Sequence, residues 1–478
     1  MSSTPDSRQE SQISSESEPL TPATTRRALL GLGVPVYFEL LSGVVAGIVD
    51  TVWVARLGEA AVGAVAVAST LENVLLGIIL MANVGTTVLI ADALGGRRRA
   101  ELPVAIRAAG ILWLAITPVV ALGGFLFRDQ VAQLLVGSGG GEVHRLAVEF
   151  FALSFPGMAV FFAQNVVDGI FKGTGDTRTP MRMAILANAC ILVLDPLLIY
   201  GVGVLPKMGV QGAALGMMLG RAVALGVSLV LLRRKRLGDI GGETTTLHWR
   251  PALRRILAVG LPASGDFVLR MGISAALVGI VARFGEDPLA AYGIGIKMIL
   301  FVTMAFYAFR QAGSILTART RGAGQNADRV IGRQSLLLAT AVGVGAGLVL
   351  ALSGRVIMGF FSNASSVVDS GEVLFWYLLP YLVLLAGVVG LGGVFMGGRQ
   401  TRSLFWVTVL GACVQLPLAS ALSSLPALDV KGVWLSMIIG TAAQYVMTLL
   451  LFQRLVGAGK SESERRHLEL QAATVDNC

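Results

Sequence analysis

Long apolar blocks alternate with short polar segments along almost the whole chain. An apolar stretch of about 20 residues is long enough to cross the hydrocarbon core of a bilayer as a helix. The chain is therefore predicted to be an all-α integral membrane protein. Its twelve predicted spans lie at residues 28–54, 61–91, 103–126, 146–170, 183–203, 209–232, 256–282, 289–316, 334–353, 372–396, 403–422 and 431–453.

The polar segments divide the spans into two groups of six. Residues 1–27 are rich in Ser, Thr, Pro and Glu, which predicts a disordered tail. A basic segment at 233–255 links an N-lobe, residues 28–232, to a C-lobe, residues 256–453, and residues 454–478 form a second polar tail. This division leaves room for short loops but for no large domain outside the membrane.

Short motifs recur between the two lobes. The run Val-Ala-Arg-Leu-Gly-Glu at 54–59 returns as Val-Ala-Arg-Phe-Gly-Glu at 281–286, and Gly-Val-Pro at 33–35 returns as Gly-Leu-Pro at 260–262, both at an offset of 227. Each copy holds six spans, an even number, so both copies enter the membrane from the same side. This predicts two pseudo-symmetric six-helix bundles related by an axis along the membrane normal, a plan typical of transporters.

Composition and charge support a membrane topology. Of 478 residues, 54% are hydrophobic and only 14% are charged, which excludes a large soluble enzyme. The net charge of +9 does not indicate nucleic acid, because the basic residues cluster between apolar blocks. With the N-terminus inside, 26 Lys and Arg lie on inner segments and 7 on outer ones. This bias predicts a multi-pass protein of the plasma (inner) membrane with both termini in the cytoplasm.

Several segments resemble a known family. Residues 49–58 (Val-Asp-Thr-Val-Trp-Val-Ala-Arg-Leu-Gly), 172–180 (Lys-Gly-Thr-Gly-Asp-Thr-Arg-Thr-Pro), 194–200 (Leu-Asp-Pro-Leu-Leu-Ile-Tyr) and 209–214 (Gly-Val-Gln-Gly-Ala-Ala) are similar to multidrug and toxic compound extrusion (MATE) transporters. The resemblance covers about residues 28 to 453, and the arginines in spans seven and eight resemble its prokaryotic DinF-like branch. The major facilitator superfamily shares the twelve-span plan, but its D-R-x-G-R-R loop is matched only in part at 92–98.

The resemblance implies a secondary-active exporter that exchanges amphipathic, often cationic organic molecules for protons, with Na⁺ as the alternative coupling ion. Its expected partners are small organic substrates and the bilayer, without nucleic acid or cofactor, and a monomer suffices for two bundles. A flippase for a lipid-linked precursor shares the architecture. It would need a strongly basic cavity, which would require the five intramembrane bases to converge: Arg107, Arg221, Arg270, Lys297 and Arg310. A membrane enzyme is disfavoured because no nucleophile, base or metal cluster gathers at one face.

Acidic residues at membrane depth indicate ion or substrate pathways. Glu39 and Asp50 are 11 residues apart in span one, which places them on one helix face about 16 Å apart. Pro35 removes a helix hydrogen bond below them and allows span one to bend. The resemblance assigns the bend to Pro35 and cation or proton coupling to Asp50.

Asp195 in span five is a further candidate coupling residue, and Asn188 lies seven residues before it, on the same helix face. The resemblance places Asp195 and Asn165 in the N-lobe cavity, which Gln164 and Tyr37 are also candidates to line. The family's second asparagine of span five is Ile191 here, so the polar network around the acids is expected to differ.

Other energy sources and ions fit the sequence poorly. No complete phosphate-binding loop supports an ATP-driven pump, since the position of the first Walker glycine is Arg454. No histidine or cysteine spacing indicates a metal site. In the C-lobe, Asp266 and Arg270 are four residues apart and are expected to neutralise each other, while residues 373–396 of span ten contain no acid. A C-lobe sodium site therefore lacks ligands, and the sequence favours H⁺ over Na⁺.

Overall fold

The structure, a computed structural model, describes residues 21–137, 141–201, 206–235 and 249–475, with side chains up to residue 457. Within these residues twelve helices are long and apolar enough to span a membrane, and each overlaps one predicted span. The N-lobe helices are α2 (Pro22–Ala55), α3 (Glu59–Gly95), α4 (Glu101–Leu126), α6 (Gly141–Gly173), α7 (Arg178–Tyr200) and α8 (Val210–Arg234). The C-lobe helices are α9 (Trp249–Val281), α10 (Glu286–Gly322), α11 (Asp328–Phe361), α12 (Ser365–Gly397), α13 (Thr401–Ser423) and α14 (Val430–Val475).

The first helix begins earlier than the apolar pattern predicts. Residues 22–27, expected to be part of a disordered tail, form the first turns of α2. The Thr21 hydroxyl caps this helix by accepting a hydrogen bond from the Thr24 N–H, and Pro22 occupies the first turn, where its missing N–H costs nothing. That expectation was wrong for these six residues; the rest of the predicted tail lies outside the described residues.

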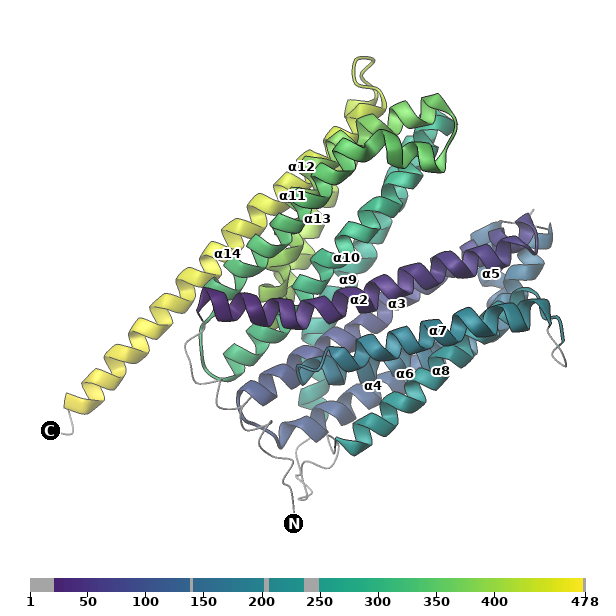
Figure 1. Cartoon of the computed structure of the whole chain (residues 1–478). Helices are drawn as coiled ribbons and strands as arrows, with labels where there is room; N and C mark the ends of the chain where they lie inside the picture. The colour runs from purple at the N-terminus through teal and green to yellow at the C-terminus, as the bar shows by residue number, and fades with distance from the viewer. Residues whose placement is uncertain (1–20, 138–140, 202–205, 236–248, 476–478) are drawn as a thin grey trace, which may run out of the picture.

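The two other polar segments are also partly helical. Helix α8 continues to Arg234 and α9 begins at Trp249, so both ends of the predicted linker at 233–255 belong to helices, and residues 236–248 lie outside the described part. Helix α14 runs on through the polar tail to Val475, as its long extension shows in Figure 1. A short helix that the sequence pattern does not predict, α5 (Arg128–Val136), lies between α4 and α6.

Each lobe has its own apolar core, as expected for two bundles. The N-lobe core includes the fully buried rings of Phe150, Phe151 and Phe162, and the C-lobe core includes those of Phe306 and Phe375. The helices of the two lobes approach each other near the start of α2 and diverge toward the opposite end (Figure 1). We call the end where α2 begins the proximal end and the opposite end the distal end.

The first helix of each lobe packs against the other lobe. Helix α2 contacts α10 and α11 as well as α7, and α9 contacts α3 and α4 as well as α13. Leu29 of α2 is buried in a C-lobe cluster with Leu316 and Ile331, and Ile256 of α9 is buried in the N-lobe core. The two contacts are equivalent under the repeat, so the lobes are joined by a reciprocal crossing of α2 and α9.

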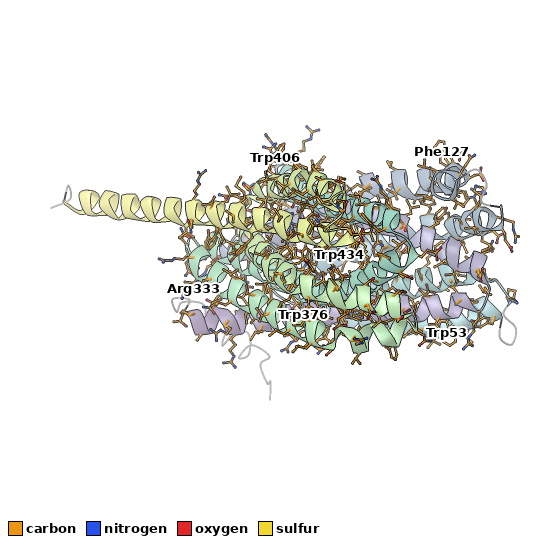
Figure 2. The ribbon with its side chains drawn as sticks, turned by 90° about the horizontal axis from the view of Figure 1, so that it is seen from above. Trp53, Phe127, Arg333, Trp376, Trp406 and Trp434 are labelled. Atoms are coloured by element: carbon orange, nitrogen blue, oxygen red, sulfur yellow. The ribbon has the colours of Figure 1, made fainter. Side chains whose placement is uncertain are left out.

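The proximal contact between the lobes depends on glycine. A side chain at Gly260 would overlap the main chain at Met81, and one at Gly85 would overlap the main chain at Ile256. The Ser264 hydroxyl donates to the Gly77 carbonyl at 2.5 Å. Close helix approach through small residues is the usual means of association in membranes. Figure 2 places Trp53 and Phe127 at the distal end, and Arg333 at the end from which α14 extends.

Candidate functional site

Two carboxyl groups meet inside the N-lobe. Asp50 of α2 and Asp195 of α7 lie close enough for their carboxyl groups to interact directly. Asp195 is completely buried and Asp50 is 7% exposed. Among the described residues no N–H or O–H donor reaches Asp50 Oδ1 or either carboxyl oxygen of Asp195. Two carboxylates in contact cannot both be ionised cheaply, so the pair is suited to hold a proton between its oxygens.

The distal end of α2 is anchored one turn beyond Asp50. The Tyr200 hydroxyl of α7 donates to the Trp53 carbonyl at 2.6 Å, and the two rings meet edge to face at 6.4 Å. The Arg56 guanidinium lies over the Trp53 ring at 5.2 Å. These contacts hold α2 against α7 and so bring Asp50 to Asp195. They account for the aromatic residues in the two motifs that surround these acids.

Helix α8 closes the site behind Asp195. A β-carbon at Gly216 would overlap Asp195 Oδ1, and side chains at Gly212 and Gly220 would overlap the main chain of α7. Gly216 is a site residue that the motifs did not indicate. The sequence nevertheless contains a pattern that indicates it: Gly212, Gly216 and Gly220 are four residues apart. Glycines at this interval lie on one helix face and permit close packing of a neighbouring helix.

Gly216→Ala is expected to reduce transport because the added methyl group must displace the Asp195 carboxyl. Overpacking of this kind typically costs about 1–3 kcal/mol. Gly226→Ala on the same helix is the matched control, since a β-carbon there meets no atom within 4 Å. The measurement is uptake of a fluorescent cation into inverted vesicles, at equal protein content. Equal rates for the two variants would show that the α7–α8 contact does not position Asp195.

An ion pair between α3 and α8 lies beside the carboxyl pair. Glu72 of α3 pairs with Arg221 of α8 at 3.5 Å and accepts from the Ser154 hydroxyl of α6 at 3.1 Å. The Arg221 guanidinium lies over the Phe161 ring at 4.4 Å. Both charges act on Asp50. The structure thus places Glu72 beside the carboxyl pair, close enough for its charge to act on Asp50.

Glu39 belongs to a second polar cluster. Its Oε1 accepts from Lys172 of α6 at 2.7 Å, and both side chains are largely buried. Gln164 donates to Asp168 at 2.7 Å and to the Ser228 hydroxyl of α8 at 3.2 Å. Glu39 and Lys172 both act electrostatically on Asp168, which joins the two interactions into one cluster. Glu39 is thus paired directly with a lysine, whereas among the described residues no basic side chain forms an ion pair with Asp50.

The other residues predicted for the cavity lie in different surroundings. Asn188 of α7 donates to the Ser42 hydroxyl of α2 at 2.9 Å. Asn165 donates back to the Phe161 carbonyl of its own helix at 3.0 Å. Tyr37 is partly buried, with its ring 5.8 Å from that of Phe38. A role for these residues and for Gln164 in binding a substrate stays a prediction.

Pro35 lies inside α2 and is buried. Because proline has no N–H, the hydrogen bond to the carbonyl four residues earlier is missing there. Figure 1 shows that α2 is not straight and changes direction along its length. On the proximal side of Pro35, Gly33 faces Phe309 of α10, and on its distal side the helix follows α7. Pro35 therefore lies where α2 passes from one lobe to the other.

The loop motif at 172–180 has a structural explanation. Asp176 lies before α7 and accepts from the Thr179 N–H at 3.0 Å and the Thr179 hydroxyl at 2.6 Å. Its carboxylate also pairs with Lys235. Burial would raise the pKa of Asp176, but the hydrogen bonds from Lys235 and Thr179 outweigh burial and lower it below its usual value. The acid of this motif thus stabilises the start of α7.

The C-lobe holds its acid in a closed arrangement. Asp266 of α9 accepts from both terminal nitrogens of Arg310 at 3.1 Å, from Arg270 at 3.2 Å, and from the Thr408 hydroxyl. This confirms the expected pairing of Asp266 with Arg270 and adds Arg310. No group of three or more potential metal ligands is found among the described residues. With two arginines on one carboxylate, the arrangement does not favour a bound cation.

The two six-helix lobes with twelve candidate spans are the plan of a membrane transporter, and comparisons with known proteins agree. A family model described as MatE matches residues 35–197 and 262–420. A probable multidrug resistance protein NorM of Thermotoga maritima is 26% identical over 89% of this chain and 92% of its own length. An FAD transporter of Shewanella oneidensis is 24% identical over 91% and 96%. A structure titled as the outward-facing conformation of a multidrug resistance MATE family transporter superposes with a TM-score of 0.83 at 21% identity, covering 91% and 97%.

The chain belongs to the MatE family. This confirms the resemblance stated from the motifs, together with the twelve-span fold. The family model matches the two lobes separately, in register with the internal repeat. The protein is therefore a multi-pass membrane transporter.

Proposed function

We propose that this protein is a secondary-active exporter that exchanges amphipathic, cationic organic molecules for protons, and that the Asp50–Asp195 pair carries the proton. The observation behind this proposal is that the two buried carboxyls contact each other without any donor from the described residues. Such a pair is stable with one proton between its oxygens and repulsive without it. Its protonation therefore changes the charge of the N-lobe interior by one unit.

The coupling of this charge to transport follows from the position of α2. When Asp50 is ionised, its negative charge favours an organic cation between the lobes. Proton uptake removes that charge and so weakens the hold on the cation. Because α2 contacts both lobes and contains Pro35, a change at Asp50 acts on the helix that joins them. We further propose that the protein is a monomer in the plasma (inner) membrane, with its proximal end in the cytoplasm, as the distribution of Lys and Arg indicates.

The basic residues support an exporter of cations over a flippase for a lipid-linked precursor. A flippase needs arginines free to bind phosphate, but Arg221 pairs with Glu72, and Arg270 and Arg310 pair with Asp266. The remaining two intramembrane bases, Arg107 and Lys297, are exposed side chains on α4 and α10. The five bases thus divide between separate ion pairs and exposed helix positions instead of forming one cluster.

Transport by purified protein in vesicles tests this proposal. A fluorescent organic cation is followed while a proton gradient or a sodium gradient is imposed alone. We expect transport under the proton gradient and no stimulation by sodium at constant pH. Drive by sodium alone would refute proton coupling, and transport of an anionic substrate in preference to the cation would refute the proposed substrate class.

A further inference from the structure

An arginine-lined groove lies at the proximal end between α2 and α11. The cavity has a volume of about 450 Å³ and is lined by Pro22 and Arg26 of α2 and by Arg329, Val330, Arg333, Gln334 and Leu337 of α11. Its two walls come from different lobes, since α2 crosses here to the C-lobe. No acidic side chain of the described part of the chain lines it. No ion pair involves its three arginines among the described residues.

The order of side chains along both walls matches the boundary between lipid headgroups and acyl chains. On α11, Arg329 and Arg333 are followed on the same face by Leu337, which is 48% exposed. On α2, Arg26 is followed one turn later by Leu30, which is 37% exposed. Residues four apart lie one above another on a helix. The arginines therefore lie at headgroup level, and exposed leucines continue the groove toward the hydrocarbon core.

The polar side chain at the back of the groove orients one arginine. Gln334 is only 4% exposed, and its Oε1 accepts from Arg26 Nε at 3.2 Å. This bond leaves the two terminal nitrogens of Arg26 for another partner. Guanidinium groups bind phosphate oxygens through paired N–H donors. The chemistry of the groove therefore fits a phosphate carried at the membrane surface.

The equivalent groove of the other repeat also contains arginines, but one of them has an acidic partner. Helix α9 crosses to α4 as α2 crosses to α11, and it forms a groove of about 500 Å³ lined by Arg250, Arg254 and Arg255. There the first residue of α4, Glu101, approaches Arg255 at 3.6 Å. At the repeat offset of 227, the counterpart of Glu101 is Asp328, the first residue of α11.

Asp328 does not pair with the described arginines of the groove between α2 and α11. It is buried and pairs instead with Arg321 of α10, inside its own lobe. In the α4–α9 groove, Glu101 thus pairs with an arginine of the groove. In the α2–α11 groove, the equivalent acid, Asp328, pairs with an arginine outside the groove. Within the described residues, the arginines of the α2–α11 groove have no paired counter-charge, which an external anion can supply.

We propose that the α2–α11 groove binds the headgroup of one anionic glycerophospholipid. Basic pockets between transmembrane helices are suited to such headgroups. The bound phosphate would bridge Arg26 of α2 to Arg329 and Arg333 of α11. It would thereby hold the first turns of α2 against the C-lobe and stabilise the arrangement in which the lobes meet proximally.

Mass spectrometry of the intact protein released from detergent tests this proposal. The protein is titrated with phosphatidylglycerol, and the fraction carrying one lipid is measured for the wild type, for Arg329→Gln/Arg333→Gln, and for the charge-matched control Arg250→Gln/Arg254→Gln. Each arginine near an anionic lipid contributes about fivefold in affinity, so the first variant should bind phosphatidylglycerol about 25-fold more weakly. The control should bind as the wild type does. All substituted positions are exposed, which favours normal folding.

Thermal unfolding in detergent gives a second measurement, which distinguishes binding of a phospholipid headgroup from binding of inorganic phosphate. Phosphatidylglycerol should raise the unfolding temperature of the wild type and of the control but not that of Arg329→Gln/Arg333→Gln. Phosphatidylcholine should have no such effect. Equal loss of phosphatidylglycerol binding in both double variants would overturn the proposal, because it would show a response to overall surface charge. Equal stabilisation by inorganic phosphate at the same concentration would overturn the assignment to a lipid.

Discussion

Asp50→Asn is expected to reduce proton-driven export to the background of empty vesicles, while the protein still folds and inserts. Asparagine has nearly the shape of aspartate, and its amide can donate to Asp195, so the contact between α2 and α7 persists. It cannot release and rebind a proton, however, and the charge change that the exchange requires is lost. Asp195→Asn should impair export for the same reason. The measurement is cation transport under an imposed proton gradient.

Asp369→Asn is the matched control for these two variants. Asp369 lies near the distal end of α12, with 63% of its side chain exposed, in a surface pair with Arg355 at 3.5 Å. Its removal should leave export unchanged, because exposed ion pairs contribute little. Export at the normal rate by Asp50→Asn would show that Asp50 is not the coupling residue, and Asp195 or Glu39 would take its place.

Glu39→Gln is expected to destabilise the protein by about 3–5 kcal/mol, the usual cost of breaking a buried ion pair on one side. The cause is Lys172, which is 4% exposed and would keep its charge without the partner it has at 2.7 Å. Export should fall together with the amount of folded protein. Thermal unfolding of the purified variant in detergent measures the effect.

The double variant Glu39→Gln/Lys172→Met separates a structural role of Glu39 from a coupling role. Removing both charges leaves no isolated ion, so stability should recover most of the way to that of the wild type. If Glu39 serves mainly to neutralise Lys172, export should recover as well. A stable double variant without export would assign Glu39 to proton coupling, and a fully stable Glu39→Gln would show that the ion pair is not needed.

The spans could be predicted from the sequence because the membrane restricts the possible structures. A backbone in hydrocarbon must satisfy its own hydrogen bonds, so each long apolar block becomes a helix. The apolar pattern was less informative at the ends of the blocks, where local composition does not determine the residue at which a helix begins or ends. Residues 22–27 look like the polar tail before them, yet Thr21 and Pro22 begin a helix there. The short helix α5 is amphipathic and too brief to be recognised by its apolar content.

The candidate site was predicted only in part. The motifs indicated Asp50 and Asp195 individually through their resemblance to a family, and the structure brings the two together. The partner of Glu39 could not be inferred, because Lys172 lies 133 residues away on another helix. Pairings between helices depend on how the helices are rotated and shifted against each other. Periodicity within one helix contains no information about that register.

The reciprocal crossing of α2 and α9 has a consequence for biogenesis. Domains emerge and fold in order of synthesis, from the N-terminus onward. Helix α2 is the first span to enter the bilayer, yet the surfaces that receive its proximal turns belong to the eighth and ninth spans, α10 and α11. Until those spans are inserted, Leu29 lacks the C-lobe residues that bury it. The packing of α2 is therefore completed only after the C-lobe spans are inserted, and the helix that carries Asp50 reaches its final position late in assembly.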